Sequence, residues 1–267
     1  MIIDVHIHTP RYRQPVPTAD DVPNDNWRPD QVRSAKPSWQ DAIAALEPVD
    51  RAIVFNIAAD PRQEIVDDGG LMYESRQVND DTAAFVSVHL DKLIGFLSVH
   101  PHDPGALDEI ERATQELGLV GIKVGPNYQN FDPVGSEAFA IYARAEALGL
   151  PMLFHQGTSP VSTADLDYAH PRHMDRIATR FPGLKVIMAH IGHPWQVDCL
   201  VVIRKHPNVF ADISGNFYRP WSYYNAFRLA TEWGVMHKIL FASDFPIATP
   251  QETIDALERV NDFIAGT

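Results

Sequence analysis

Three polar side chains alternate with apolar ones at the start of the chain, in the run Asp4-Val5-His6-Ile7-His8. The apolar residues predict a buried strand, and in a strand residues i and i+2 point to the same face. We therefore expect Asp4, His6 and His8 to point inward, with successive Cα atoms about 6.6 Å apart. Ile3, Val5 and Ile7 should point outward, toward the helices. Two imidazoles at this spacing can converge on one metal ion, because metal–nitrogen bonds are about 2 Å long. A lone core histidine is more often structural, but this pair favours a metal site.

Further metal-capable side chains end three other predicted strands. His155 ends the run LFH, His190 ends MAH and Asp244 ends FASD. Because the carboxyl ends of parallel strands meet at one mouth of a barrel, these groups should lie close to the histidine pair. Five such groups at four strand ends are improbable by chance, so together they predict a metal-dependent active site.

Short runs rich in Ile and Val alternate with amphipathic stretches along all 267 residues. Eight strands, each followed by a helix, predict the α/β class and a closed (β/α)8 TIM barrel, with one domain over 1–267. An open doubly wound sheet is disfavoured because no glycine-rich phosphate turn follows the first strand. The predicted strands cover 1–7, 51–57, 93–99, 119–125, 151–155, 184–190, 208–214 and 237–243.

The composition argues against some classes of binding partner. A formal charge of −13 argues against nucleic acid or an anionic membrane as the main partner, but not against a small anionic substrate. The single cysteine, Cys199, excludes an intrachain disulfide and a thiolate metal cluster. No basic and apolar leader and no apolar run of about 18 residues is present, so a soluble cytoplasmic protein is expected. A homodimer is the default expectation for a soluble enzyme.

Several side chains beyond the metal-capable set are candidates for substrate binding. Asn127 and Tyr128 follow the fourth strand and should hang over the barrel mouth. Arg11 and Arg219 are candidates for binding a substrate carboxylate, because guanidinium offers a bidentate fork to that group. His193 opens the helix after the sixth strand, in the run HPW, and a capping or loop-bracing role is expected for it.

The pattern of HxH on strand one, His on five, His on six and Asp on eight resembles the amidohydrolase superfamily. The runs GIKVGPNYQNFDP, LPMLFHQG, AHIGHPW and SDFP resemble more narrowly its amidohydrolase-2 branch. That branch includes aminocarboxymuconate-semialdehyde decarboxylase, resorcylate-type decarboxylases and pyrone-dicarboxylate-lactonase-like hydrolases. The resemblance runs over nearly the whole chain, and its motifs are specific for the superfamily but not for one reaction.

The resemblance implies that His6, His8, His155 and Asp244 bind one divalent ion, zinc in the first place and manganese as the alternative. Three imidazoles and a carboxylate also suit zinc by their chemistry. Asp244 would take a proton from a metal-activated water and pass it to the leaving group. His190 would act as a base, or as an electrophile that holds the water or a substrate oxygen.

Lys123 on the fourth strand leaves two interpretations open. In binuclear members of the superfamily a lysine at this strand is carboxylated and bridges two metals. The other interpretation, which we favour, is a free catalytic ammonium that polarises a substrate carbonyl or pairs with a carboxylate. Asp4 lies one pleat deeper than His6, and we expect it to be a buried structural partner.

Two reactions compete for this site. The first is hydrolysis, in which metal-activated water attacks an ester, lactone or amide carbonyl of a small carboxylate-bearing substrate. The alternative is nonoxidative decarboxylation of an aromatic or unsaturated carboxylic acid. Analogy alone favours the hydrolase. A metal-dependent nuclease is disfavoured by the negative charge and by Lys123 in place of the usual glutamate. A barrel that only binds a ligand is disfavoured by the complete ligand set.

Overall fold

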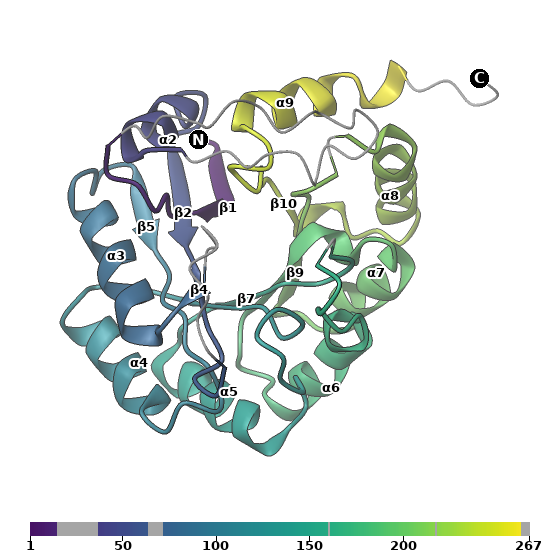
Figure 1. The fold of residues 1–267 in the computed structure, drawn as a ribbon. Coiled ribbons are helices and arrows are strands. Elements are labelled where there is room, and N and C mark those ends of the chain that lie inside the picture. The colour runs from purple at the N-terminus through teal and green to yellow at the C-terminus, as the bar shows by residue number, and fades with distance from the viewer. Residues whose placement is uncertain (15–36, 64–71, 160, 217, 263–267) are drawn as a thin grey trace.

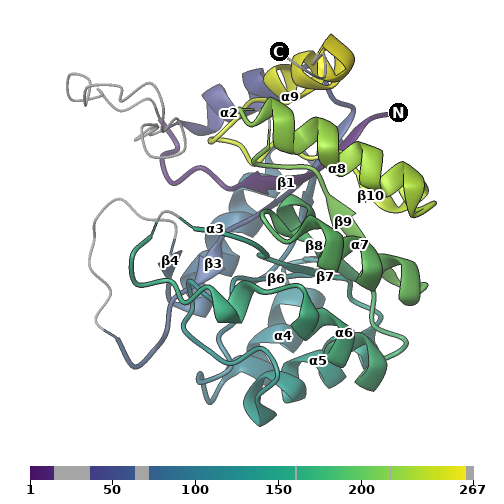
Figure 2. The ribbon, with the colours of Figure 1, turned by 90° about the vertical axis from the view of Figure 1, so that its right-hand side faces the viewer.

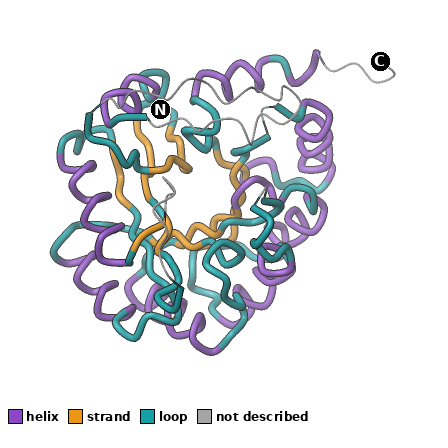
Figure 3. Tube along the Cα trace, in the orientation of Figure 1, coloured by secondary structure: helices purple, strands orange, loops and turns teal. Residues whose placement is uncertain are grey.

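The computed structural model describes residues 1–14, 37–63, 72–159, 161–216 and 218–262, and within them the chain forms a (β/α)8 barrel (Figure 1). Parallel strands line the inside and helices form the outer ring, as Figure 3 shows along the barrel axis. The predicted fold is confirmed. Among the described helices, none combines the length and apolar character needed to cross a bilayer.

The barrel strands pair in two parallel arcs, in the order β1-β2-β5 and β10-β9-β8-β7-β6. Isolated parallel bridges, Ile7 to Phe245 and Leu97 to Ile122, join the two arcs at both ends. A separate parallel pair is formed by β3 (Ile57–Ala58) and β4 (Met72–Tyr73). The barrel strands are β1 (Ile3–His8), β2 (Arg51–Phe55), β5 (Leu93–Gly95), β6 (Ile122–Val124), β7 (Met152–Phe154), β8 (Val186–Met188), β9 (Val209–Asp212) and β10 (Ile239–Leu240).

One helix follows each barrel strand and covers its outer face (Figure 2). Apolar side chains of helices and strands form the largest core cluster between the two layers. Gly149 ends one helix in the left-handed region with φ of 69°, where glycine has no steric penalty. The helices are α2 (Trp39–Ala45), α3 (Ser75–Ser87), α4 (Ala106–Gln115), α5 (Ser136–Leu148), α6 (Arg172–Arg180), α7 (Gln196–Lys205), α8 (Pro220–Glu232) and α9 (Pro250–Glu258).

The first strand departs from simple alternation. Its register against β2 shifts between Asp4 and Ile7, which marks a bulge. Val5 packs in a cluster with Ile53, Phe55 and Ile187 of other barrel strands, whereas Ile7 packs among residues of α2. The expectation that Val5 points outward was therefore wrong. Because a bulge inserts an extra residue, the alternation of side chains is interrupted there.

Asp4 holds this bulge and helps to close the barrel. Its Oδ1 accepts hydrogen bonds from the backbone amides of His6 and Ser243, each at 3.1 Å. Its Oδ2 is buried and has no hydrogen-bond partner. Burial raises the pKa of Asp4 to about 7, although the hydrogen bonds from Ser243 and His6 act to lower it. Asp4 is therefore a structural residue, whose carboxyl group links β1 to the segment that follows β10.

Replacing Asp4 with Asn should remove a pH dependence of stability. A folded-state pKa of about 7, above the ordinary 3.8, means that the folded protein binds the proton more tightly than the unfolded chain. Wild-type stability should then fall as pH rises from about 4 to 7, by up to about 4 kcal/mol. Asp4→Asn should show a flatter profile in urea unfolding of the chelator-treated protein. Equal slopes in both proteins would contradict this assignment.

Candidate active site

A cavity of about 140 Å³ opens at the carboxyl ends of the strands, where barrel enzymes place their sites. Three of the predicted metal-binding or catalytic residues contribute to its wall, together with two predicted substrate-binding residues. The cavity is lined by Tyr128, His155, Thr158, His190, His193, Gly215, Tyr218, Arg219, Asp244 and Ile247.

His6, His8 and Asp244 converge as predicted. Oδ1 of Asp244 lies 3.3 Å from Nε2 of His6 and 3.4 Å from Nε2 of His8. The three candidate ligand atoms lie within 4.8 Å of one another. Burial opposes ionisation of Asp244, but the neighbouring histidines outweigh it and hold the pKa of this carboxyl at about 2. Asp244 is therefore a carboxylate at neutral pH.

Asp212, at the end of β9, is the site residue that the sequence analysis missed. Its Oδ2 accepts a hydrogen bond from Nδ1 of His6 at 3.0 Å. Its Oδ1 accepts from the backbone amides of His190 and Ser214, each at 3.0 Å, and from the Ser214 hydroxyl. Burial disfavours the charge, but His6 and these donors hold the pKa of Asp212 well below its usual range. The run ADIS did contain the signal, a carboxylate at the end of a buried strand.

His190 and His155 form a chain of imidazoles beside the carboxylates. Nδ1 of His190 lies 3.1 Å from the carbonyl oxygen of Ser214, so this nitrogen carries the proton and donates it. Its Nε2 lies 3.2 Å from Nδ1 of His155 and therefore accepts from it. This assignment leaves Nε2 of His155 without a proton, and that buried atom has no partner among the described residues. Burial lowers the pKa of His155 well below its usual range, so the ring is neutral.

Two site residues have a left-handed backbone that is unfavourable for a side chain other than glycine. His190 has φ of 60° and Asp244 has φ of 67°. The amide of His190 is held by Asp212, and the amide of Asp244 donates to the carbonyl of His6 at 2.9 Å. Such strain persists only where surrounding contacts determine the geometry, and it is typical of functional sites.

Lys123 lies deeper in the barrel than the cavity. Its Nζ is 3.2 Å from Nε2 of His6 and 4.5 Å from the centre of the Phe55 ring, and the side chain is buried. Burial lowers the pKa of Lys123 to about 8, partly offset by Asp244 and Asp212. The residue belongs to the site, but it is not among the described residues that line the cavity.

The donor set fits a divalent metal ion. Asp212 fixes the proton of His6 on Nδ1, which leaves Nε2 as a ligand atom, the arrangement of many metal-binding histidines. Nε2 of His155 is buried and available. Lys123 donates to Nε2 of His6 in the described state, so metal binding requires this ammonium to give up that hydrogen bond. His6 belongs to two groups of converging ligand atoms, one with His8 and Asp244 and one with His190 and Asp212. His155 belongs to neither of these two groups.

The predicted substrate-binding residues divide into three kinds. Tyr128 and Arg219 line the cavity, and burial raises the pKa of Tyr128 to about 12, which keeps its hydroxyl protonated. Asn127 is buried, and neither polar atom of its side chain has a partner among the described residues. Arg11 lies with its guanidinium 5.7 Å from the Tyr12 ring centre and is outside the described cavity lining.

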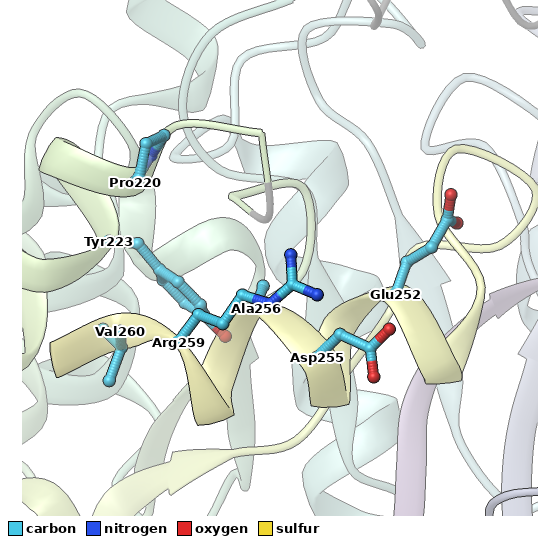
Figure 4. A pocket seen from close by; sticks show the side chains of 7 residues that line it. All are labelled: Pro220, Tyr223, Glu252, Asp255, Ala256, Arg259 and Val260. Atoms are coloured by element: carbon cyan, nitrogen blue, oxygen red, sulfur yellow. The ribbon is translucent and has the colours of Figure 1, made fainter. Parts of the chain in front are cut away.

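Two other features resemble sites but lack their chemistry. A cavity of about 310 Å³ lies between α8 and α9, outside the barrel, and its lining contains Arg259 and Asp255 but no histidine (Figure 4). A metal-capable cluster away from the candidate active-site cavity joins Asp60, His100 and His102. There both ring nitrogens of His100 are already bonded, to the carbonyl of Gln129 and to the amide of His102, which indicates a structural role.

Asp212→Asn should weaken metal binding by about 10- to 100-fold, because the amide no longer fixes the proton of His6 on Nδ1. Zinc affinity would be measured by competition with a chromogenic chelator, with circular dichroism to confirm folding. Asp175→Asn is the matched control, since that carboxylate pairs with Lys205 and His206 at the surface. Wild-type zinc affinity in Asp212→Asn would contradict the role of this carboxylate.

Comparison with solved structures supports the fold. An uncharacterised TIM-barrel protein from Bordetella bronchiseptica has a TM-score of 0.69 and 19% identity, covering 97% of this chain and 94% of that chain. A probable 2-pyrone-4,6-dicarboxylic acid hydrolase from Acinetobacter baumannii, with citric acid bound, has a TM-score of 0.63 and 16% identity over 98% and 92%. A dihydroxybenzoic acid decarboxylase from Polaromonas, with bound manganese and the inhibitor 2-nitroresorcinol, has a TM-score of 0.65 and 19% identity over 100% and 92%.

The sequence profile of one enzyme family, described as amidohydrolase, matches residues 3–265. This match includes every strand of the barrel and each predicted metal-binding residue. It agrees with the resemblance drawn from the HxH pair and the later strand-end residues. The chain belongs to the amidohydrolase family.

Proposed function

We propose that this protein is a metal-dependent hydrolase that cleaves an ester, lactone or amide bond of a small carboxylate-bearing substrate. The observation that carries this proposal is the state of Asp244. Its carboxylate lines the cavity, faces the ligand nitrogens of His6 and His8, and is ionised at neutral pH. A base in this position suits the removal of a proton from an attacking water.

His6, His8, His155 and Asp244 would hold one divalent ion, with zinc first and manganese second among the candidates. When bound, the ion polarises the substrate carbonyl and lowers the pKa of water. Asp212 orients His6 for this purpose by its hydrogen bond to Nδ1. Lys123 stays a free ammonium in this proposal, which makes the site mononuclear.

Asp244 and His190 divide the proton transfers. Asp244 takes the proton of the attacking water and delivers it to the departing oxygen or nitrogen. His190 has its Nδ1–H fixed by Ser214, and its Nε2 accepts from Nδ1 of His155 in the described state. To hold the attacking water, Nε2 of His190 would exchange the hydrogen bond from His155 for one from the water.

Substrate binding falls to the polar groups around the same cavity. Arg219 donates through Nη1 to the carbonyl of Gly215 at 2.8 Å and stacks on the Tyr218 ring, and these contacts orient it at the wall. Arg219 and the protonated hydroxyl of Tyr128 suit an anionic substrate. Asn127 would bind a polar substrate atom, and Arg11 remains a second candidate for a carboxylate.

A nonoxidative decarboxylase is the second candidate, because similar solved structures include decarboxylases of hydroxylated benzoic acids. That reaction requires an acid that protonates carbon after carbon dioxide leaves. The neighbouring histidines hold the pKa of Asp244 at about 2, so this carboxyl is ionised at rest and would have to gain a proton before it could donate one. This resting charge, and not the geometry of the site, is our ground for placing hydrolysis first.

The reaction class can be tested by following products. Zinc- and manganese-loaded protein would be assayed on lactones and esters by acid release, and on aromatic acids by carbon dioxide release. Acid release without carbon dioxide is expected. Carbon dioxide formed without a new acid group would reject hydrolysis in favour of the lyase.

His190→Asn should lower kcat about 10²- to 10⁴-fold on the substrate found, because it removes a group that handles protons. Metal content should stay at the wild-type level, as measured by elemental analysis. His173→Asn is the control, since His173 lies on α6, bonds to the carbonyl of Asp167 and is outside the cavity lining. Unchanged kcat in His190→Asn would remove this residue from the mechanism.

A further inference from the structure

His193 lines the cavity on the side where α7 and α8 begin. Its Nδ1 lies 2.8 Å from Nε2 of Gln196 and 3.0 Å from Oγ of Ser222. Gln196 is the first residue of α7, and Ser222 lies in the first turn of α8. Nε2 of Gln196 also donates a hydrogen bond to Oγ of Ser222 at 2.8 Å. The imidazole is thus anchored through one nitrogen to two helices.

This anchor determines where His193 carries its proton. The side-chain amide nitrogen of Gln196 can only donate a hydrogen bond, so Nδ1 of His193 accepts it and carries no proton. The neutral ring therefore carries its proton on Nε2, and Nε2 makes no hydrogen bond within the described part of the chain. Burial, with the charges of Arg219 and His190, lowers the pKa of His193 to about 4, which keeps the ring neutral at pH 7.

The backbone of His193 is fixed as well. Its carbonyl accepts from the amide of Thr158 at 2.8 Å, in the loop after β7. A Cβ on Gly157 would lie 2.1 Å from the same carbonyl oxygen, and the φ of Gly157 is 90°. Only glycine allows this close approach, so the loop and His193 are locked together. A donor held by both main chain and side chain is preorganised for ligand binding.

His193 lines the same cavity as Arg219, and it belongs to none of the metal-capable groups among the described residues. Together His193 and Arg219 offer a neutral N–H donor and a guanidinium, a combination that suits a carboxylate.

We propose that His193 is a specificity-determining residue whose Nε2–H, with Arg219, binds the carboxylate of the substrate. This inference rests on the proposed function, in which the metal ligands face the reacting carbonyl. A dicarboxylate ligand would mimic such a substrate, with one carboxylate at the metal ligands and the other at His193 and Arg219. The Gln196–Ser222 pair positions the donor, and a loop-bracing role alone does not explain its free Nε2.

The test measures ligand binding and needs no turnover. Calorimetry on the zinc-loaded protein would compare succinate, glutarate and adipate with the monocarboxylates of equal chain length, butyrate, pentanoate and hexanoate. Because a charge-assisted hydrogen bond contributes more than a neutral one, at least one dicarboxylate should bind about tenfold or more tightly than its matched monocarboxylate.

Two isosteric variants separate the nitrogens of His193. In His193→Gln the amide nitrogen occupies the position of Nε2, so the preference for the dicarboxylate should be retained. In His193→Asn the amide reaches only the position of Nδ1, so most of that preference should be lost while zinc content and monocarboxylate affinity stay at the wild-type level. His206→Asn is the control, since His206 pairs with Asp175 at the surface.

Three results would overturn this assignment: no dicarboxylate preference in the wild type, a preference retained in His193→Asn, or an equal loss in both variants. A fall in zinc content or monocarboxylate binding in His193→Asn would also overturn it and would indicate loop bracing. Failure of the proposed function has a different signature, the absence of hydrolysis or of bound zinc in the wild type.

Discussion

The buried carboxylate of Asp212 is the interaction on which the rest of the site depends. It accepts donors from the His6 ring on β1, from the backbone of His190 after β8, and from both groups of Ser214 after β9. An unpaired charge at this depth would be strongly unfavourable, so every donor must be in place when the barrel closes. One carboxylate thereby sets the tautomer of a metal-capable histidine and the position of His190, for which we propose a catalytic role.

The barrel holds two site residues in a backbone conformation that they would rarely adopt in an isolated chain. His190 and Asp244 sit at strand ends in a left-handed backbone conformation, which costs roughly 1–3 kcal/mol per residue. Their amides bond to Asp212 and to the carbonyl of His6, so contacts with neighbouring strands offset this cost. The packed layer between strands and helices holds those strands in register. The packed core thereby fixes the orientation of these two residues at the carboxyl ends of the strands.

Periodicity was sufficient to predict the barrel and the convergence of His6, His8 and Asp244, because strand ends in such a barrel share one mouth. It failed at Val5, where a register shift between Asp4 and Ile7 interrupts the alternation of side chains that the pattern of apolar residues predicts. Asp212 was missed because it is a single acidic residue in a buried strand, with no second metal-capable residue beside it in the sequence. The tautomer of His193 depends on Gln196 and Ser222 from two different helices, and only the folded structure joins them.

We propose that His6, His8, His155 and Asp244 hold one metal ion, and the rest of the proposed chemistry depends on it. The most direct measurement is metal per chain, by elemental analysis of protein purified without chelator, for the wild type and His6→Ala/His8→Ala. About one ion in the wild type and none in the variant is the predicted result. No bound ion after zinc and manganese are supplied would contradict the account. Two ions per chain would also contradict it, because Lys123 would then have to bridge a second metal.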